Sequence, residues 1–437
     1  MKTNPVFGRT FDCPCGKTHT IQPRQIVYGE DALDRLAGLC AGVTAGRHVA
    51  VLVDARTRRA AGAEAARALS QEGWLVSEYL VPDPSAGCSP VCDDVTKEAL
   101  AIRMDRCDLI LSVGAGVIND LGKWLAMEAG VPWVTFATAA SMNGYTSANV
   151  APTLAGVKSL LRAAPPAAVV SSPSVLAAAP YELTAAGLGD VLAKSVSSAD
   201  WKLNHLLFGD YYCRASVELI AEIEPLYLER PEALAQRDAQ ALRALFEALL
   251  LSGAAMTMAE SSAPASGGEH LISHSLDMMS SLDGRRHDLH GRQVGVGTIL
   301  ASELYRRVLA VQRPRLVEPA GEVDREFWGP LAEEVARQYA QKLPRLRQAA
   351  EKLSQPGQWD DLRASLAAML RPPETIRDCL AAAGAAWRAE HIGCDRHRLL
   401  AAFAHGHEIR SRFTILDLAG LVGVLPGAAG PIVQQWA

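Results

Sequence analysis

Short apolar runs alternate with helical patterns over the first 170 residues of the chain. The pattern predicts strands at 48–55, 74–81, 107–116 and 131–140, helices at 62–73, 95–104 and 117–130, and a last candidate strand at 166–176. Strands and helices in this order are typical of a parallel sheet that helices cover on both faces. The amino-terminal part is therefore predicted to be a doubly wound α/β domain.

The pattern changes after Pro180. Apolar residues then recur at helical spacing from Leu183 to the end, with helices predicted at 232–260 and near 291–312, 330–353, 357–370 and 373–388. No strand is expected there. Because prolines cluster between 165 and 180, we place the border in this region and predict two domains, 1–172 and 173–437.

The composition indicates a soluble, intracellular globular protein, and we expect it in the cytoplasm. Hydrophobic residues make up 49% of the 437 residues and charged residues 21%, with a net charge of -5. This charge gives no reason to expect a nucleic-acid partner. No apolar run reaches the roughly 18 residues of a membrane span, and the amino terminus lacks the pattern of a signal peptide.

Nine cysteines at irregular spacing argue against a disulfide framework. Cys13, Cys15 and His19 form C-x-C-G-x-x-x-H, which resembles part of a zinc site. A structural zinc site needs four ligands, and no second Cys/His pair lies nearby in the sequence. A turn that leads into the first strand is the interpretation we prefer.

A glycine-rich turn ends the predicted strand 107–116. Gly114 and Gly116 would let the backbone approach a pyrophosphate, and the helix that begins near Val117 would point its amide groups at the same place. Asn119 and Asp120 lie in its first turn. The motif is not G-x-G-x-x-G, because Asn119 occupies the third position, so a plain strand-to-helix turn stays an alternative.

Other polar residues also follow predicted strands. Asp54 ends the strand 48–55, where an acid can bind ribose hydroxyls and favour NAD over NADP, or can simply be a solvated turn residue. Thr138, Ser141 and Ser147 lie in a loop after the strand 131–140. They are suited to bonding a cofactor, although loops are commonly rich in such residues.

The helical part contains candidate metal ligands. Asp190 lies near the start of a predicted helix, His270 and His274 are four residues apart and share a helix face, and His287 and His290 precede a glycine. Two imidazoles and a carboxylate make a three-ligand site with an open coordination position. Spacing alone does not choose among these residues.

Five blocks of the sequence, in order, resemble the motifs of sn-glycerol-1-phosphate dehydrogenases. These blocks are LSVGAGVINDLGKWLA, TAASMNGYTS, AGLGDVLAKSVSSADWKL, ASGGEHLISH and LHGRQVGVGT, and the likeness extends from about residue 24 to 420. That family belongs to the iron-containing alcohol dehydrogenase superfamily, with glycerol dehydrogenase and dehydroquinate synthase. The resemblance implies a dehydroquinate synthase-like fold: a Rossmann-like nucleotide-binding domain, an all-α metal-binding domain, and an active site in the cleft between them.

The resemblance also assigns roles to residues. It makes Asp190, His270 and His290 the ligands of one divalent metal ion, which is zinc, nickel or iron in relatives. It also makes His274 a substrate contact, and His287 either a bystander or a residue that supports a ligand. It implies NAD as cofactor, with NADP as the alternative, and dihydroxyacetone phosphate as the substrate reduced to sn-glycerol 1-phosphate. We also expect a homo-oligomer. The implied nucleotide contacts are Asp54, Gly114, Gly116, Val117, Ile118, Asn119, Asp120, Thr138, Ser141 and Ser147.

One position departs from the family pattern. Asn143 stands where relatives carry a substrate-contacting aspartate, and an amide cannot take up the hydroxyl proton at neutral pH. His274 is the substitute that we expect. Three alternatives stay open: a dehydrogenase for another small polyol or phosphorylated carbonyl, a carbocycle-forming synthase like dehydroquinate synthase, and a catalytically inactive binding protein that has kept the fold.

Overall fold

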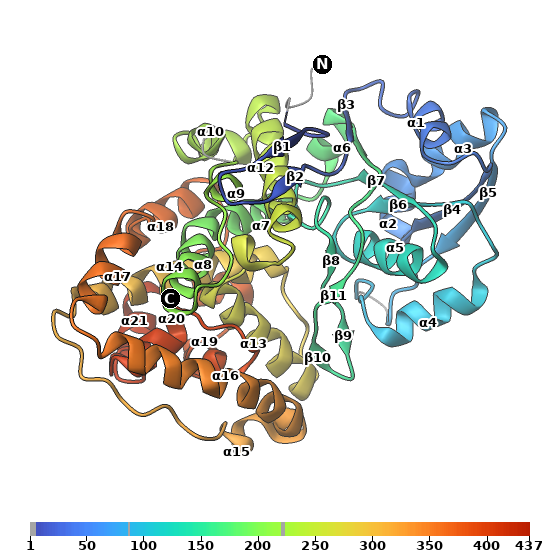
Figure 1. Ribbon diagram of the computed structural model, residues 1–437. Helices are drawn as coiled ribbons and strands as arrows, with labels where there is room; N and C mark the ends of the chain where they lie inside the picture. Colours follow the sequence, from blue (N-terminus) through green and yellow to red (C-terminus); the bar gives the residue numbers. More distant parts are fainter. Residues whose placement is uncertain (1–5, 86–87, 220–222) are drawn as a thin grey trace. The chain divides into compact units, whose positions relative to one another are not determined.

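The computed structural model describes residues 6–85, 88–219 and 223–437 (Figure 1). The chain forms two compact units, and each is discontinuous in sequence. The first consists of Met1–Gly187 and Glu218–Ser261, and the second of Leu188–Val217 and Ser262–Ala437. The division into contiguous domains, 1–172 and 173–437, stays a prediction.

A six-stranded, fully parallel sheet forms the centre of the first unit, with strand order β3-β12-β7-β6-β4-β5. Its strands are β3 (Gln25–Tyr28), β4 (His48–Val53), β5 (Leu75–Leu80), β6 (Leu109–Gly114), β7 (Trp133–Ala137) and β12 (Ala168–Ser171). The central strands β6 and β7 are buried along their whole length, which explains their continuous apolar sequences.

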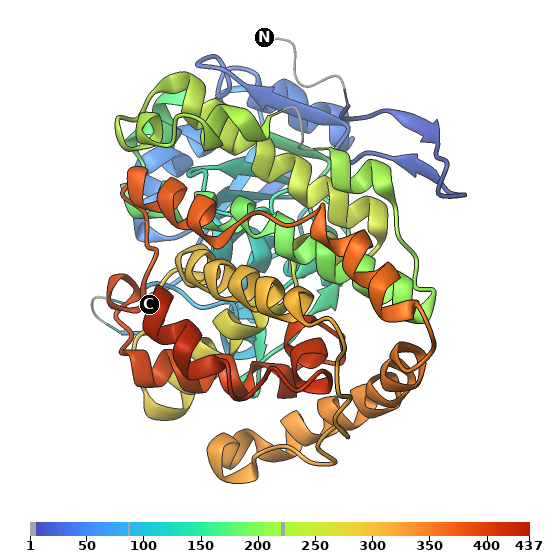
Figure 2. The same cartoon turned by 90° about the vertical axis from the view of Figure 1, so that its left-hand side faces the viewer.

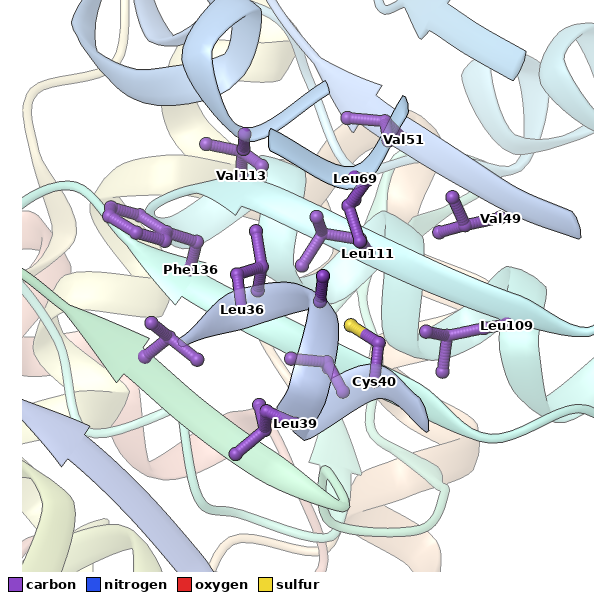
Figure 3. Close-up of a cluster of buried hydrophobic side chains, with 14 of the residues drawn as sticks. Leu36, Leu39, Cys40, Val49, Val51, Leu69, Leu109, Leu111, Val113 and Phe136 are labelled. Carbon is purple, nitrogen blue, oxygen red and sulfur yellow. The ribbon is translucent and has the colours of Figure 1, made fainter. Parts of the chain in front are cut away.

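Helices pack on both faces of this sheet. On one face, Leu36 and Cys40 of α1 (Leu36–Val43) and Leu69 of α3 (Ala63–Gln71) contact alternate residues of β4 and β6, as Figure 3 shows. On the other face, α4 (Asp94–Arg103) and α5 (Gly116–Ala129) cover the residues between, such as Leu52 and Ile110. Two opposite apolar layers are the doubly wound arrangement that the sequence predicted.

The first unit has further elements outside the sheet. Three small antiparallel pairs join β1 (Thr10–Asp12) to β2 (Thr18–Thr20), β9 (Thr153–Leu154) to β10 (Val157–Lys158), and β8 (Asn149–Val150) to β11 (Leu161–Arg162). Its other helices are α2 (Ala55–Thr57), η1 (Arg58–Gly62), α6 (Pro173–Ala178), α10 (Glu224–Leu228), α11 (Glu232–Ala235) and α12 (Ala239–Ala259).

Among the described residues, α12 alone has the length and apolar composition to cross a membrane. Its apolar window is 83% buried inside the protein, as expected for a core helix.

The second unit is helical, and no strand occurs in it (yellow to red after residue 262 in Figures 1 and 2). The helix α7 (Tyr181–Leu192) leads into it. The remaining helices are α8 (Lys194–Phe208), α9 (Arg214–Glu218), η2 (Ala263–Ala265), α13 (Gly268–Asp283), α14 (His290–Ala310), α15 (Arg325–Trp328), η3 (Gly329–Leu331), α16 (Ala332–Leu353), α17 (Gln358–Ala367), α18 (Pro373–Ala382), η4 (Ala389–Ile392), α19 (Arg396–His405), η5 (Gly406–Glu408), α20 (Ile415–Leu421) and α21 (Ala429–Trp436).

The observed elements confirm the predicted fold class, with local differences. The predicted strand 166–176 is β12 followed by the helix α6, because Pro173 at the first helical position starts a helix. The predicted helix 232–260 is two helices, α11 and α12, and Asp238 between them caps α12 by accepting bonds from the amides of Gln240 and Ala241.

Candidate metal and nucleotide sites

Three helices of the second unit bring Asp190, His270 and His290 together. Asp190 lies near the end of α7, His270 in the first turn of α13, and His290 is the first residue of α14. Each offers one ligand atom, and these atoms lie within 4.8 Å of one another. Asp190 and His270 are buried, whereas His290 is exposed, so one side of the cluster is accessible.

The spacing of these atoms suits a metal ion. Nε2 of His270 lies 3.7 Å from Oδ1 of Asp190, which is too long for a hydrogen bond. Nitrogen and oxygen ligands of tetrahedral zinc are about 3.4 Å apart, as calculated from the usual bond lengths. Two imidazoles and one carboxylate are also a donor set that zinc, nickel and iron accept. The residues present therefore fit a divalent cation.

A second carboxylate orients His270. Oε1 of Glu269 accepts a hydrogen bond of 2.8 Å from Nδ1 of His270, which leaves Nε2 for the metal. Burial works against the charged imidazolium, but the carboxylates of Asp190 and Glu269 outweigh it and raise the pKa of His270 to about 9. Without a metal, a proton on His270 compensates these carboxylates.

His290, in this cluster, and His274, next to it, have distinct environments. Nδ1 of His290 lies 3.2 Å from the hydroxyl of Ser273, which leaves its Nε2 for a ligand. The ring of His274 stacks on that of His290, with centroids 5.6 Å apart. His287 instead pairs with Asp277 at 3.2 Å, so it lies outside the metal cluster.

A buried aspartate fixes the start of α13. Oδ2 of Asp200 accepts a bond of 2.7 Å from the amide of Gly268, and its Oδ1 accepts bonds from the hydroxyl of Tyr305 and the amide of Ile415. Burial, aided by the charge of Glu269, raises the pKa of Asp200 to about 8 despite these bonds. The first turn of α13, and with it His270, is thereby held in place.

Glycines let the ligand-bearing helices approach one another closely. A Cβ atom on Gly189 would lie 2.0 Å from the carbonyl oxygen of Gly291, and one on Gly297 would lie 2.6 Å from that of Glu269. Any larger residue would push α7 or α13 away from α14. These glycines therefore set the distances between Asp190, His270 and His290.

In the first unit, the turn from Gly114 to Gly116 leaves a helix start open. No side chain caps the first residue of α5. The helix begins at Gly116, so Asp120 lies just beyond the first turn, which contains no acid. A Cβ on Gly116 would meet nothing within 4 Å, whereas one on Gly114 would lie 2.6 Å from Ile118. The free amides and the positive helix end suit a phosphate, so the turn fits a nucleotide cofactor.

The other predicted nucleotide residues lie near this turn or at strand ends. The amide of Thr138, which follows β7, donates to the carbonyl of Gly114 at 3.2 Å. Asp54 follows β4 and caps α2, accepting bonds from the amides of Arg56 and Thr57 at 2.7 and 2.8 Å. Val117 is half-buried, Asn119 is fully buried, and Ser141 is nearly so. Direct contacts of these residues with a nucleotide stay predictions.

A buried lysine on α5 organises the loop that contains Asn143. Nζ of Lys123 donates to the carbonyls of Gly144 and Asn149 at 2.9 and 2.7 Å and to the hydroxyl of Ser147 at 3.2 Å. Burial lowers the pKa of Lys123, although Asp120, at 3.4 Å, opposes this. The predicted nucleotide contact Ser147 therefore also belongs to an internal network.

The same loop rests on α12. The hydroxyl of Thr146 donates to the carbonyl of Leu250 at 2.6 Å. A Cβ on Gly253 would lie 2.3 Å from the carbonyl oxygen of Asn143. Asn143 is therefore held between α5 and α12, with its side chain half-buried.

Sequence reasoning missed the residues that support the ligands. Glu269 and Ser273 immediately precede His270 and His274, so adjacency to a histidine was the one available signal. Lys123 was visible as a single charge in an otherwise apolar helix segment, LGKWLA.

The fold occurs in several solved dehydrogenases. A probable glycerol dehydrogenase from Sinorhizobium meliloti 1021 aligns with a TM-score of 0.61 at 18% identity, over 94% of this chain and 98% of that one. Glycerol dehydrogenase from Schizosaccharomyces pombe aligns with the same TM-score at 16% identity, over 95% and 90%. A profile of the family described as "Iron-containing alcohol dehydrogenase" matches residues 27–180.

Sequence relatives narrow the class. Glycerol-1-phosphate dehydrogenase [NAD(P)+] from Bacillus subtilis (strain 168) is 30% identical over 410 residues, which is 94% of each chain. The enzyme of the same name from Thermococcus sibiricus is 33% identical over 283 residues, 65% of this chain and 78% of the relative. The chain belongs to the glycerol-1-phosphate dehydrogenase family. This confirms the resemblance found in the sequence and the expectation of an NAD(P)-dependent dehydrogenase.

Proposed function

We propose that the protein reduces dihydroxyacetone phosphate to sn-glycerol 1-phosphate with NADH, in a reversible hydride transfer. The cluster of Asp190, His270 and His290 carries the proposal, because it offers two imidazoles and a carboxylate within 4.8 Å of one another in a chain 30% identical to an enzyme named for this activity. The reaction consumes one NADH and one proton for each ketone reduced.

We assign Asp190, His270 and His290 as ligands of one divalent ion, which is zinc, nickel or iron. When bound, such an ion polarises the oxygen of the ketone or alcohol as a Lewis acid. Glu269 and Ser273 fix the ring orientations of His270 and His290, so the ligands are preorganised. The exposed side of His290 leaves access for a substrate oxygen.

His274 is our candidate for the group that supplies the proton. Its ring packs 6.1 Å from that of His270 and 5.6 Å from that of His290, both centroid to centroid. An imidazole can give and take a proton near neutral pH. Asn143 would contact the substrate by hydrogen bonds alone, since its amide does not ionise.

The nicotinamide cofactor would bind with its phosphates at the start of α5, beside Gly116. Asp54 still has one oxygen that accepts no bond from the α2 backbone, and this oxygen is our candidate for a ribose contact. Arg56 lies 3.5 Å from that oxygen, so NADPH has to be tested beside NADH.

The decisive experiment follows NADH oxidation by metal-loaded protein over a panel of small ketones, with and without phosphate. We expect the highest kcat/KM with dihydroxyacetone phosphate, and a product that an oxidase specific for sn-glycerol 3-phosphate does not attack. His270→Gln should abolish metal binding and activity together, whereas His287→Gln is its matched control. No NADH oxidation with any ketone at full metal loading would refute the proposal.

A dehydrogenase for another small polyol is the second candidate, because Asn143 replaces an aspartate of the family pattern. A higher kcat/KM for an unphosphorylated ketone would favour it, and Asn143→Asp should then shift the preference towards dihydroxyacetone phosphate. Net NADH consumption equal to the substrate consumed would exclude a synthase of the dehydroquinate synthase type. We further propose a cytoplasmic homo-oligomer, which light scattering on the purified protein tests.

A further inference from the structure

The β1–β2 hairpin contains three metal-binding side chains that the proposed function does not use. The strands pair Phe11 with His19, and Cys13 and Cys15 lie in the connection between them. The amide of Gly16 donates to the carbonyl of Cys13 at 2.9 Å, and the amide of Cys13 donates to the carbonyl of Lys17 at 3.0 Å. Gly16 has a φ of 86°, which L side chains rarely adopt. This tight turn points both thiols and the imidazole at one place.

The atoms that could bind a metal are close together. The sulfurs of Cys13 and Cys15 and a ring nitrogen of His19 lie within 4.8 Å of one another. Sγ of Cys15 lies 3.2 Å from Nε2 of His19. On tetrahedral zinc, sulfur and nitrogen ligands are about 3.6 Å apart, as calculated from the usual bond lengths. Cys13 and His19 are also 9% and 4% exposed, so the polar atoms are largely withdrawn from water.

Neither of the simpler explanations accounts for this arrangement. The two thiols form no disulfide bond, since none of the nine cysteines does. A plain turn needs Gly16 but not two cysteines and a histidine around it. The strands are only three residues long, and an isolated two-stranded hairpin of this size is marginally stable in water. A bound metal would add to the stability of the hairpin.

We propose that Cys13, Cys15 and His19 hold a structural zinc ion that is separate from the ion at Asp190, His270 and His290. Thiolate ligands select soft or borderline ions such as zinc, whereas the catalytic donor set lacks sulfur. The two sites therefore differ in ligand chemistry, and they can be distinguished in one molecule.

A closed structural site needs a fourth ligand from outside the hairpin. Cys213 is our candidate for this ligand. Cys213→Ser should therefore lower the zinc affinity, and a water ligand is assigned if it does not.

Metal content and cobalt spectroscopy on the full-length protein test the proposal. We expect two ions per chain in the wild type, and an intense thiolate-to-cobalt charge-transfer band after exchange with Co²⁺. The Cys13→Ser/Cys15→Ser double variant should hold one ion and lose this band, while NADH-linked activity is retained. His270→Gln should do the opposite, losing the other ion and the activity but keeping the band. Cys40→Ala, which removes a buried thiol elsewhere, should change neither ion.

A second pair of variants decides the question even if the double variant does not fold. His19→Cys keeps a ligand, so the protein should retain zinc and show a stronger charge-transfer band. His19→Ala should weaken zinc binding by about 100-fold or more, since loss of an outer-shell partner alone already costs about 10- to 100-fold. Zinc removal should also speed tryptic cleavage after Lys17, which lies inside the proposed metal loop.

A wild-type protein that takes up cobalt without a thiolate band overturns the proposal. So does a Cys13–Cys15 disulfide in the freshly purified protein, found by mass spectrometry as the loss of two hydrogens. Each of these results leaves the dehydrogenase activity, and therefore the proposed function, to be judged separately.

Discussion

Metal binding at the Asp190–His270–His290 cluster is expected to release a proton from His270. In the metal-free protein the pKa of His270 is raised to about 9. At pH 7, two units lower, the imidazole is about 99% protonated, whereas an ordinary histidine would be only about 25% protonated. A metal ligand must be deprotonated, so each ion bound should displace about one proton from this residue alone.

Titration calorimetry in two buffers of different ionisation enthalpy measures this number. The Cys13→Ser/Cys15→Ser variant is the appropriate background, because it removes the protons that the hairpin thiols would release. We expect release from His270 to fall to about half a proton near pH 9. Glu269→Gln keeps all three ligands but removes one of the carboxylates that raise the pKa, so it should release less at pH 7.

The same pKa also sets the stability of the metal-free protein. A folded-state pKa of about 9, against 6.5 for an ordinary histidine, stabilises the fold at pH below 6.5. This contribution, on the order of 3 kcal/mol, should disappear as the pH rises through 9. The metal-loaded protein should show the opposite trend in its melting temperature. Tight binding at pH 7 without proton release beyond that of ordinary histidines would refute the reasoning.

Three further variants test other parts of the structure. Gly189→Ala places a Cβ 2.0 Å from a backbone carbonyl and should lower metal affinity at least about 10-fold, whereas Gly295→Ala, with its nearest neighbour at 3.3 Å, should have less effect in the same titration. Lys123→Met leaves buried carbonyls without a donor; we expect a loss of about 3 kcal/mol in denaturant unfolding and a higher KM for NADH. Glu408 has a lowered pKa, because bonds from His405 and its other neighbours outweigh burial, so it stabilises the fold above its unfolded pKa and loses this effect as the pH falls. Glu408→Gln should therefore melt at a temperature that depends less on pH below about 5.

The sheet was predictable because its strands are buried on both faces. β4, β6 and β7 consist almost wholly of apolar residues, and such runs can be recognised in a single sequence. The hairpin strands β1 and β2, TFD and THT, contain one large apolar residue between them, so periodicity had nothing to detect. The strands of the pairs β8–β11 and β9–β10 are two residues long, which is too short for hydrophobic periodicity to be recognised.

The metal cluster shows a different limit. Spacing offered five candidate residues, and the family resemblance, rather than periodicity, selected Asp190, His270 and His290. The residues that hold these ligands in place could not be predicted in this way. Asp200, for example, lies 68 residues before the amide of Gly268 that it binds. The bonds of Lys123 likewise reach 21 to 26 residues along the chain. Such contacts depend on the tertiary fold, so no pattern in the neighbouring sequence indicates them.

The discontinuity of the two units restricts how such a gene can recombine. The chain passes from one unit to the other after residues 187, 217 and 261. The first unit includes α12, and the carbonyl of Leu250 in this helix accepts the hydrogen bond from the hydroxyl of Thr146. A single crossover between two relatives near residue 180 would combine α12 from one parent with the loop that contains Thr146 from the other. Functional chimaeras are therefore expected to exchange 1–187 and 218–261 together, so that these two stretches are inherited as one piece.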